Sequence, residues 1–440
     1  MRSSSHTLDR TKVVFDDDRA VANGGLLLPM MFAAHLGLRE LVDAHVDLGD
    51  AAGRANVGLK AVALVASLLA DGDSIDDANA LRAGCCEEVI GQWVPAPSTL
   101  GTFLRSFSWG HSRQLDVVSR ELLGRAFAAG AGPGDAPFTL DIDSTICETY
   151  GLAKQGGAKF TYTKVRGYHP LVAVMAGTGD VVHARLRGGN ANSGRGAAGF
   201  VTECFARLRD AGAGGQITLR ADSGFYSGAV VGACRKAGVR YSITVRLNKA
   251  LHKVIAAIDE PVWTPIPYFL DGADVAETTY RPFGKKGQTC RLVVRRVRPT
   301  PGSQLALFVE FTYHAFISDR DGTTLFLEAD HRRHAEIENT IRDLKYGVGL
   351  NHMPSGRFGA NAAWLALNVI AHNLLRWTTR IGLDETLLRT DTIRRRYIRI
   401  PGHVTHRGRG VQLHLASSWP WRHQFLEAAT RIRRLAVCRT

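Results

Sequence analysis

Long apolar runs, paired cysteines and the commonest catalytic loops are absent from this 440-residue sequence. The longest mainly apolar stretch, residues 61–70, is about half of a membrane span, so we expect no membrane partner. Seven cysteines are scattered without a Cys-x-x-Cys pair, which argues against a zinc ribbon and predicts reduced thiols in a cytoplasmic protein. The first residues, which lead into acidic residues 16–18, lack the pattern of a signal peptide.

Two familiar enzyme classes also find no support in the sequence. It contains neither a Gly-x-Ser-x-Gly nucleophile turn nor a Gly-x-x-x-x-Gly-Lys-Ser/Thr phosphate loop. The glycine-rich segment 188–194 lacks the lysine of such a loop, and we interpret it as a flexible loop near an active site. The pair His331 and His334 has half of a zinc-site spacing but no cysteine partner nearby.

The formal net charge of +14 is distributed unevenly along the chain. Residues 1–130 carry a net charge of −4, residues 131–330 carry +6, and residues 331–440 carry +12. A basic segment of this size indicates a polyanionic partner, with nucleic acid ahead of a membrane surface. Arginine outnumbers lysine 44 to 11, but a GC-rich genome accounts for that ratio more simply than phosphate recognition does.

Apolar periodicity divides the chain into regions of different structure. Helical spacing dominates from residue 24 to about 127 and ends in a glycine-rich linker at 129–134. The order that follows is β-β-β-α-β-α-β, then a proline-rich, strand-like segment at 259–318, two helices and a basic tail with a hairpin near Gly408. The expected strands are 138–143, 169–176, 181–186, 216–221 and 240–247, and the expected helices are 196–211, 228–237, 330–346 and 360–381.

Several acidic side chains occupy positions suited to chemistry. In strand 138–143, Asp141 and Asp143 face the side opposite to the apolar residues, where a core strand tolerates them only with ionised partners or a metal. Asp222 ends the strand 216–221 and is followed by Ser-Gly, as in a functional loop of an α/β sheet. Alone, an aspartate at a strand end is usually solvated or capping.

The helix 330–346 supplies a further carboxylate. Its polar stripe comprises His331, His334, Glu338, Arg342 and Lys345, beside an apolar stripe that we expect to be buried. Glu338 could therefore reach a metal beside the sheet while the flanking cations reach phosphate. Alone, Glu338 and Arg342 are an ordinary surface pair, and the two histidines are as readily packing or DNA-contact residues as ligands. Hard oxygen ligands favour Mg²⁺ or Mn²⁺ over zinc, and two such ions support in-line phosphoryl transfer.

With these residues in place, the chain resembles a DDE-type bacterial insertion-sequence transposase, most closely the "thirteen-eighty" group. The matching segments are residues 140–145, 167–171, 187–191, 219–225, 337–339 and 343–345. The resemblance implies an α/β fold with an RNase H-like catalytic core, and a triad of Asp143, Asp222 and Glu338 that is both catalytic and metal-binding, with Asp141 as the alternative to Asp143. A family signature of Tyr, Arg, Glu and Lys falls on His331, His334, Glu338 and Lys345, so this sequence departs from it at two positions.

The resemblance also implies an organisation and a function. The expected regions are a DNA-end-binding helical domain at 1–130, core segments at 135–258 and 319–385, a β-rich insertion at 259–318 and a basic region at 386–440. The expected activity is metal-dependent cleavage and transfer of double-stranded DNA at inverted-repeat ends and a target, by a homodimer in the bacterial cytoplasm or nucleoid. A nuclease without strand transfer and an inactive DNA-binding descendant are the alternatives. The expected DNA contacts are His331, Arg332, Arg333, His334, Arg342, Lys345, Arg394, Arg395 and Arg396.

Overall fold

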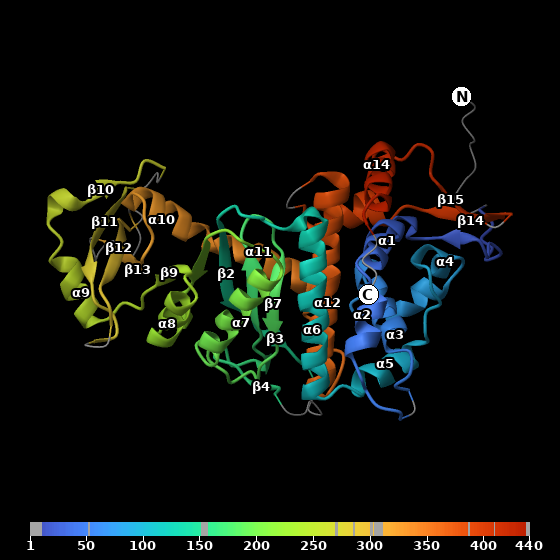
Figure 1. The fold of residues 1–440 in the computed structure, drawn as a ribbon, viewed down its shortest axis with the longest axis horizontal. Coiled ribbons are helices and arrows are strands. Elements are labelled where there is room, and N and C mark those ends of the chain that lie inside the picture. Colours follow the sequence, from blue (N-terminus) through green and yellow to red (C-terminus); the bar gives the residue numbers. More distant parts are fainter. Residues whose placement is uncertain are drawn as a thin grey trace.

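The first part of the chain folds into short packed helices, as the apolar spacing predicts. The computed structural model describes residues 11–436 except 52, 151–156, 269–271, 285–286, 300–301, 303–310, 386–387 and 409. The helices are α1 (Leu27–His35), α2 (Leu38–His45), α3 (Val57–Leu69), α4 (Cys86–Ile90), α5 (Pro97–Arg105) and α6 (Trp109–Ala126). Figure 1 shows them at one end of the molecule, beside the long helix α12 (Phe358–Trp377), which packs against α3 and α6.

A mixed β-sheet occupies the rest of the molecule. Its central strand β2 (Phe138–Ser144) is antiparallel to β6 (Leu171–Met175) and parallel to β8 (Ile217–Ala221). Beyond them lie β7 (Val181–Arg185) on one side and β9 (Arg240–Thr244) on the other. Helices α7 (Ala197–Asp210) and α8 (Gly228–Lys236) connect these strands. The five predicted strands and both helices are thus present, with ends that shift by up to three residues.

The proline-rich segment after β9 continues the same sheet. After helix α9 (Lys249–Ala256), it forms β10 (Thr264–Pro265), β11 (Ala273–Tyr280), β12 (Cys290–Val297) and β13 (Thr312–Ser318). Strand β13 pairs with β9 through Phe316, Ile317 and Ser318, so nine strands of the described chain run in the order β10-β11-β12-β13-β9-β8-β2-β6-β7. A second, smaller apolar core lies under this extension, with Val275, Val293 and Leu327 among its residues.

The helix that carries Glu338 begins earlier than its sequence pattern indicates. It starts as α10 (Thr324–Arg332), tightens into a 3₁₀ turn at Arg333–Glu336, and continues as α11 (Ile337–Arg342) and a wide turn at Asp343–Gly347. Ile337, Ile341 and Leu344 are buried, as the predicted apolar stripe requires. Helix α11 crosses β2 and β6, which places its polar residues beside the central strand.

The last part of the chain returns to the N-terminal helices. After α13 (Thr390–Ile393), strands β14 (Gly402–Arg407) and β15 (Gly410–Leu415) form the predicted hairpin, and α14 (Arg422–Arg433) packs near α1. Strand β1 (Ala20–Val21) pairs with β14, so the beginning of the described chain lies beside the hairpin. A separate small sheet consists of β3 (Cys147–Glu148), β5 (Arg166–Tyr168) and β4 (Lys159–Phe160).

No single helix among the described residues has both the length and the apolar character needed to cross a membrane. Among the described residues, one pair of helices, Gly24–His35 and Leu38–His45, is long and apolar enough when the two are taken together, although they are bent by 50° at the break between them. Length and composition alone support this pair as a membrane span.

Candidate active site

Two of the predicted aspartates meet at one edge of the central sheet. Ile142 of β2 lies opposite Ala221 of β8 in the parallel register, so the next residues, Asp143 and Asp222, emerge side by side at the carboxyl ends of both strands. Both line a groove of about 960 Å³. Neighbouring parallel strands end at the same edge of a sheet, which explains why residues 79 positions apart share one site.

The electrostatic environment of Asp143 disfavours its ionised form. Burial raises the pKa of Asp143 to about 6, and the negative charges of Asp222 and Glu338 add to the increase. A hydrogen bond from the Ser144 backbone N–H, 2.6 Å from Asp143 Oδ1, and the nearby His334 oppose that rise in pKa. Three carboxylates therefore act on one another electrostatically at this edge, and a cation would relieve their repulsion.

Asp222 is held by a tight turn. Its Oδ1 accepts a hydrogen bond of 2.9 Å from the Gly224 backbone N–H. A Cβ atom at position 224 would lie 2.8 Å from the Ser193 Cβ, so only glycine fits between this turn and the loop beside it. The Ser-Gly pair after β8 therefore allows this turn and the loop that contains Ser193 to approach each other closely.

The glycine-rich loop 188–194 is fastened in place, which corrects our interpretation of it as flexible. His169 donates a hydrogen bond from Nδ1 to the Ala191 carbonyl at 2.7 Å, since a carbonyl can only accept. Its Nε2 then accepts from the Ser144 hydroxyl at 2.9 Å, and Ser144 Oγ lies 2.9 Å from Ser193 Oγ. We name this set, His169, Ser144 and Ser193, the loop brace.

Arg187 secures the same loop from its other side. The guanidinium donates to the His169 carbonyl at 3.0 Å and to the Asn192 carbonyl at 2.9 Å. Burial lowers the pKa of Arg187 to about 10, with the nearby cations Arg195 and Arg185 adding to the effect. No role for His169, Ser193 or Arg187 was predicted from the sequence, although His169 and Arg187 lie in segments that carry the family resemblance. A buried histidine before a proline is the signal that could have indicated the brace.

Glu338, the third predicted ligand, stands on the exposed face of α11. Its charge acts on Asp143, but it does not line the groove that contains the two aspartates. Within the described residues, no three His, Cys, Asp or Glu side chains are close enough to hold one metal ion. The structure thus brings Asp143 and Asp222 together and leaves Glu338 beside them on an adjacent helix.

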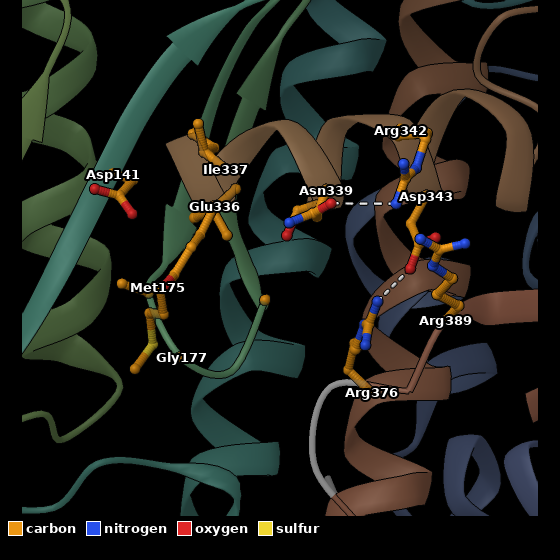
Figure 2. Close-up of a pocket in the computed structure, with 14 residues that line it drawn as sticks. Asp141, Met175, Gly177, Glu336, Ile337, Asn339, Arg342, Asp343, Arg376 and Arg389 are labelled. Carbon is orange, nitrogen blue, oxygen red and sulfur yellow. Dashed lines mark hydrogen bonds and ion pairs between the residues drawn. The ribbon is translucent and has the colours of Figure 1, made fainter. Parts of the chain in front are cut away.

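Asp141 is committed to a different partner. Both of its oxygens accept hydrogen bonds from Arg220, at 2.7 Å and 2.8 Å, and the two side chains are only 2% and 1% exposed. Although burial opposes it, the hydrogen bond that Arg220 donates to Asp141 raises the pKa of Arg220. Burial also raises the pKa of Asp141, while the hydrogen bonds and charge of Arg220 oppose that rise. Asp141 lies on a separate cavity of about 380 Å³ with Glu336 and Arg342 (Figure 2). Of the two alternatives, only Asp143 opens onto the groove.

Comparison with known proteins decides the family. The family model described as "Transposase DDE domain group 1" matches residues 5–437, nearly the whole chain. The protein is a member of this DDE transposase family. No curated protein matches it significantly. A solved structure titled "Cryo-EM structure of piggyBac transposase synaptic complex with hairpin DNA (SNHP)" is 12% identical, with 85% of this chain and 79% of that chain covered and a TM-score of 0.45.

In this transposase-family protein, the histidines of the α10–α11 helix point into the structure. His331 accepts or donates hydrogen bonds with Ser242 Oγ at 2.8 Å and Thr244 Oγ1 at 2.9 Å, and stacks on Phe316 at 4.0 Å between ring centroids. Burial holds the pKa of His331 well below its usual range. The prediction that His331 contacts DNA is therefore wrong, because packing against β9 and β13 occupies the ring.

His334 and Lys345 lie at the site but are engaged with backbone carbonyls. His334 Nε2 lies 3.1 Å from the Ile142 carbonyl, and Lys345 donates to the Ile146 carbonyl at 2.8 Å. Both contacts reach the strand and turn that carry Asp143. In the transposase these two side chains dock the Glu338-bearing helix onto β2.

The basic run after α13 divides into buried and exposed members. Arg394 is 0% exposed, and its guanidinium donates to the Leu69 carbonyl at 3.0 Å, to the Leu68 carbonyl and to Asp71 at 2.7 Å. Because these are the last carbonyls of α3, Arg394 caps that helix, and the prediction that it holds DNA phosphate is wrong. Arg395 is exposed, and Arg396 lies over the Trp421 ring.

The remaining predicted DNA contacts are exposed or partly engaged with neighbours. Arg332 lies 4.9 Å from the centre of the Tyr268 ring, and Arg333 pairs with Glu336 at 2.9 Å. Arg342 is exposed and donates to Asn339 at 3.1 Å, as Figure 2 shows. The surface pairs of Arg333 and Arg342 cost little to break, so these two arginines remain able to exchange partners with phosphate. Arg332 also pairs with the buried Glu328 at 3.5 Å.

Proposed function

We propose that this protein is a DNA transposase that binds the inverted-repeat ends of its own insertion sequence and catalyses metal-dependent strand cleavage and transfer by a cut-and-paste route. The observation that carries the proposal is the pair Asp143 and Asp222, side by side in one open groove with Glu338 on the adjacent helix. Membership of a DDE transposase family supports the same assignment.

The order of the central strands supports an RNase H-like core. In the strand order β7-β6-β2-β8-β9, the first of these strands in the chain, β2, lies in the middle. On one side β6 is antiparallel to β2 and β7 is antiparallel to β6, and on the other side β8 is parallel to β2 and β9 is parallel to β8. The strands of the predicted β insertion extend this core at its β9 edge. In this proposal, Asp143, Asp222 and Glu338 form the catalytic triad.

The donor set fits Mg²⁺ or Mn²⁺, of which two would serve one active site. Carboxylate oxygens are the ligands that these hard ions prefer. Burial raises the pKa of Asp143, and the charges of Asp222 and Glu338 add repulsion that a divalent cation would remove. Asp143, Asp222 and Glu338 would hold the ions. When bound, such ions supply positive charge to the attacking and leaving oxygens of an in-line phosphoryl transfer.

The surroundings of the groove suit nucleic acid. Phe160 and Tyr162 line it with rings that are 71% and 78% exposed, and the exposed Lys159 lies next to them. The same groove is lined by the two proposed ligands, Asp143 and Asp222, and by the cation Arg246. Exposed aromatic rings with cations beside them are typical of surfaces that bind nucleic acid.

Other parts of the chain enter the proposal through their charge and position. Residues 386–440 would hold DNA backbone phosphates, because they contain twelve arginines and two acidic residues. The helical residues 1–130 would contribute to end binding despite their net charge of −4. A homodimer acting on double-stranded DNA in the bacterial cytoplasm, in an element of the "thirteen-eighty" group, completes the proposal.

A supercoiled plasmid that carries the ends of the element tests the proposal. Incubation with the full-length protein and Mg²⁺ should yield excised and joined products on gels and by sequencing of junctions. Cleavage without joining would instead favour a nuclease, and a mobility shift without cleavage would favour a DNA-binding descendant. Either of those results would overturn the proposed strand transfer.

A further inference from the structure

The β14–β15 hairpin presents one wholly polar face to solvent. The cross-strand pairs His403–His414, Thr405–Gln412 and Arg407–Gly410 alternate with Gly402–Leu415, Val404–Leu413 and His406–Val411. Val404 is fully buried, and Leu413 and Leu415 pack against the main core. Because side chains alternate across a strand, the face with Thr405, Arg407 and Gln412 points away from the protein.

Charge along this face favours a polyanion. The hairpin 402–415 contains no acidic residue, and it belongs to a region, residues 386–440, with a net charge of +10. Two acidic residues from other parts of the chain contact histidines of β14. Asp17 is 3.5 Å from His403, and Glu88 is 2.8 Å from His406. The outer part, with exposed Arg407 and Gln412, is therefore the part left for a partner.

The shape and chemistry of this outer part match the grooves of DNA. The major groove of B-DNA admits a two-stranded β-ribbon, and glutamine and arginine form bidentate hydrogen bonds with adenine and guanine edges. Thr405 and His414, which hydrogen-bond to each other at 2.9 Å, hold the surface around Gln412 in place. A ribbon that is anchored to the core through Val404, Leu413 and Leu415 and is polar on its outer face can enter a groove without unfolding.

We propose that the outer face of the β14–β15 hairpin, through Gln412 and Arg407, reads base edges in the major groove of the transposon end. This inference rests on the proposed function. Figure 1 places the hairpin at the end of the molecule remote from α11 and the groove beside it. The hairpin therefore contacts base pairs inside the end, at a distance from the base pair that is cleaved, and it supplies sequence recognition that phosphate contacts cannot.

The test compares the full-length protein with Gln412→Ala on labelled duplexes of the element's end. Anisotropy titrations use the natural duplex and a set in which each base pair is replaced in turn. Wild type should lose affinity about tenfold for changes at one or two internal base pairs. Gln412→Ala should bind the natural duplex about tenfold more weakly, no longer distinguish those base pairs, and keep the slope of affinity against salt concentration.

Two further variants sharpen the test. Arg407→Lys keeps the charge but loses bidentate geometry, so it should lose discrimination at one G·C pair while retaining overall affinity. Gln424→Ala removes an equally exposed amide from α14 and should behave as wild type. Circular dichroism checks that each variant is folded.

The outcomes separate this inference from the proposed function. If wild type joins plasmid ends but Gln412→Ala discriminates base pairs as wild type does, the proposed base reading by the hairpin is wrong and the transposase proposal stands. A loss of affinity equal for all duplexes, or a hairpin that binds vesicles of anionic lipid in preference to DNA, would also overturn the reading role. Wild type that neither binds the ends specifically nor cleaves them would overturn both.

Discussion

Replacing Asp141 with asparagine separates the structural aspartate of β2 from the proposed catalytic one. The change leaves the Arg220 guanidinium, 1% exposed, without the carboxylate that accepts two of its hydrogen bonds. Removing one partner of a buried ion pair typically costs about 3–5 kcal/mol of unfolding free energy. Asp330 remains near Arg220, with an oxygen at 3.4 Å, so we expect the lower end, about 3 kcal/mol.

A loss of about 3 kcal/mol lowers the equilibrium between folded and unfolded protein by roughly two orders of magnitude. Guanidinium unfolding followed by tryptophan fluorescence should show the Asp141→Asn transition at clearly lower denaturant, in EDTA so that no metal contributes. Asp143→Asn is the matched control, since it lies two residues away on the same face of the same strand. We expect the control to be at least as stable as wild type, because neutralising Asp143 removes a buried charge with a raised pKa.

The reasoning would be refuted if Asp141→Asn unfolded together with wild type, or if Asp143→Asn lost as much stability. A second change checks the cause. Combining Asp141→Asn with Arg220→Gln removes both charges, and the double variant should be more stable than Asp141→Asn alone. If it is less stable, the destabilisation does not come from an unpaired guanidinium.

Three further results are expected. Asp222→Asn or Glu338→Gln should abolish DNA cleavage and leave end binding within a few-fold, and wild-type turnover in either would end the triad assignment. The folded state holds the Asp143 proton more tightly than the unfolded state, because the folded pKa of Asp143 is about 6. In EDTA, the stability from this proton is therefore present below about pH 4 and is lost as the pH rises through about 6, so the difference in unfolding free energy between wild type and Asp143→Asn should grow by up to about 3 kcal/mol over that range. A difference that stays constant with pH would contradict the raised pKa. Ser193→Ala loosens the loop brace and should raise the Mg²⁺ concentration for half-maximal cleavage about tenfold, whereas Thr202→Ala, an exposed hydroxyl on α7, should not; equal requirements would remove the brace from metal positioning.

Strand alternation and helical spacing were enough to predict the central sheet and the position of two aspartates. Asp143 and Asp222 each follow an apolar strand, and parallel pairing then brings them together whatever lies between. The pairing of β13 with β9 could not be predicted, because hydrogen bonding between strands leaves no mark on hydrophobic periodicity. The insertion therefore looked separate in sequence and is continuous in structure.

Side-chain partners were the least predictable part of the site. Arg394, Arg395 and Arg396 are a run of the same residue type, yet Arg394 is buried against α3 and Arg395 is exposed. His331 shares a polar stripe with Glu338, but pockets on β9 and β13 decide that its ring faces inward. Such choices depend on packing between segments far apart in the chain, which a local pattern does not contain.

Arg394 also has a consequence for the order in which the protein is made. The carbonyls that it caps, at Leu68 and Leu69, leave the ribosome more than 300 residues before the arginine does. Until then the last carbonyls of α3 and the Asp71 carboxylate lack this partner. A polypeptide that ends before residue 394 would therefore lack this cap on α3, which exposes its N-terminal helices to proteolysis. The packing of the N-terminal helices is thereby completed only after most of the chain has been made.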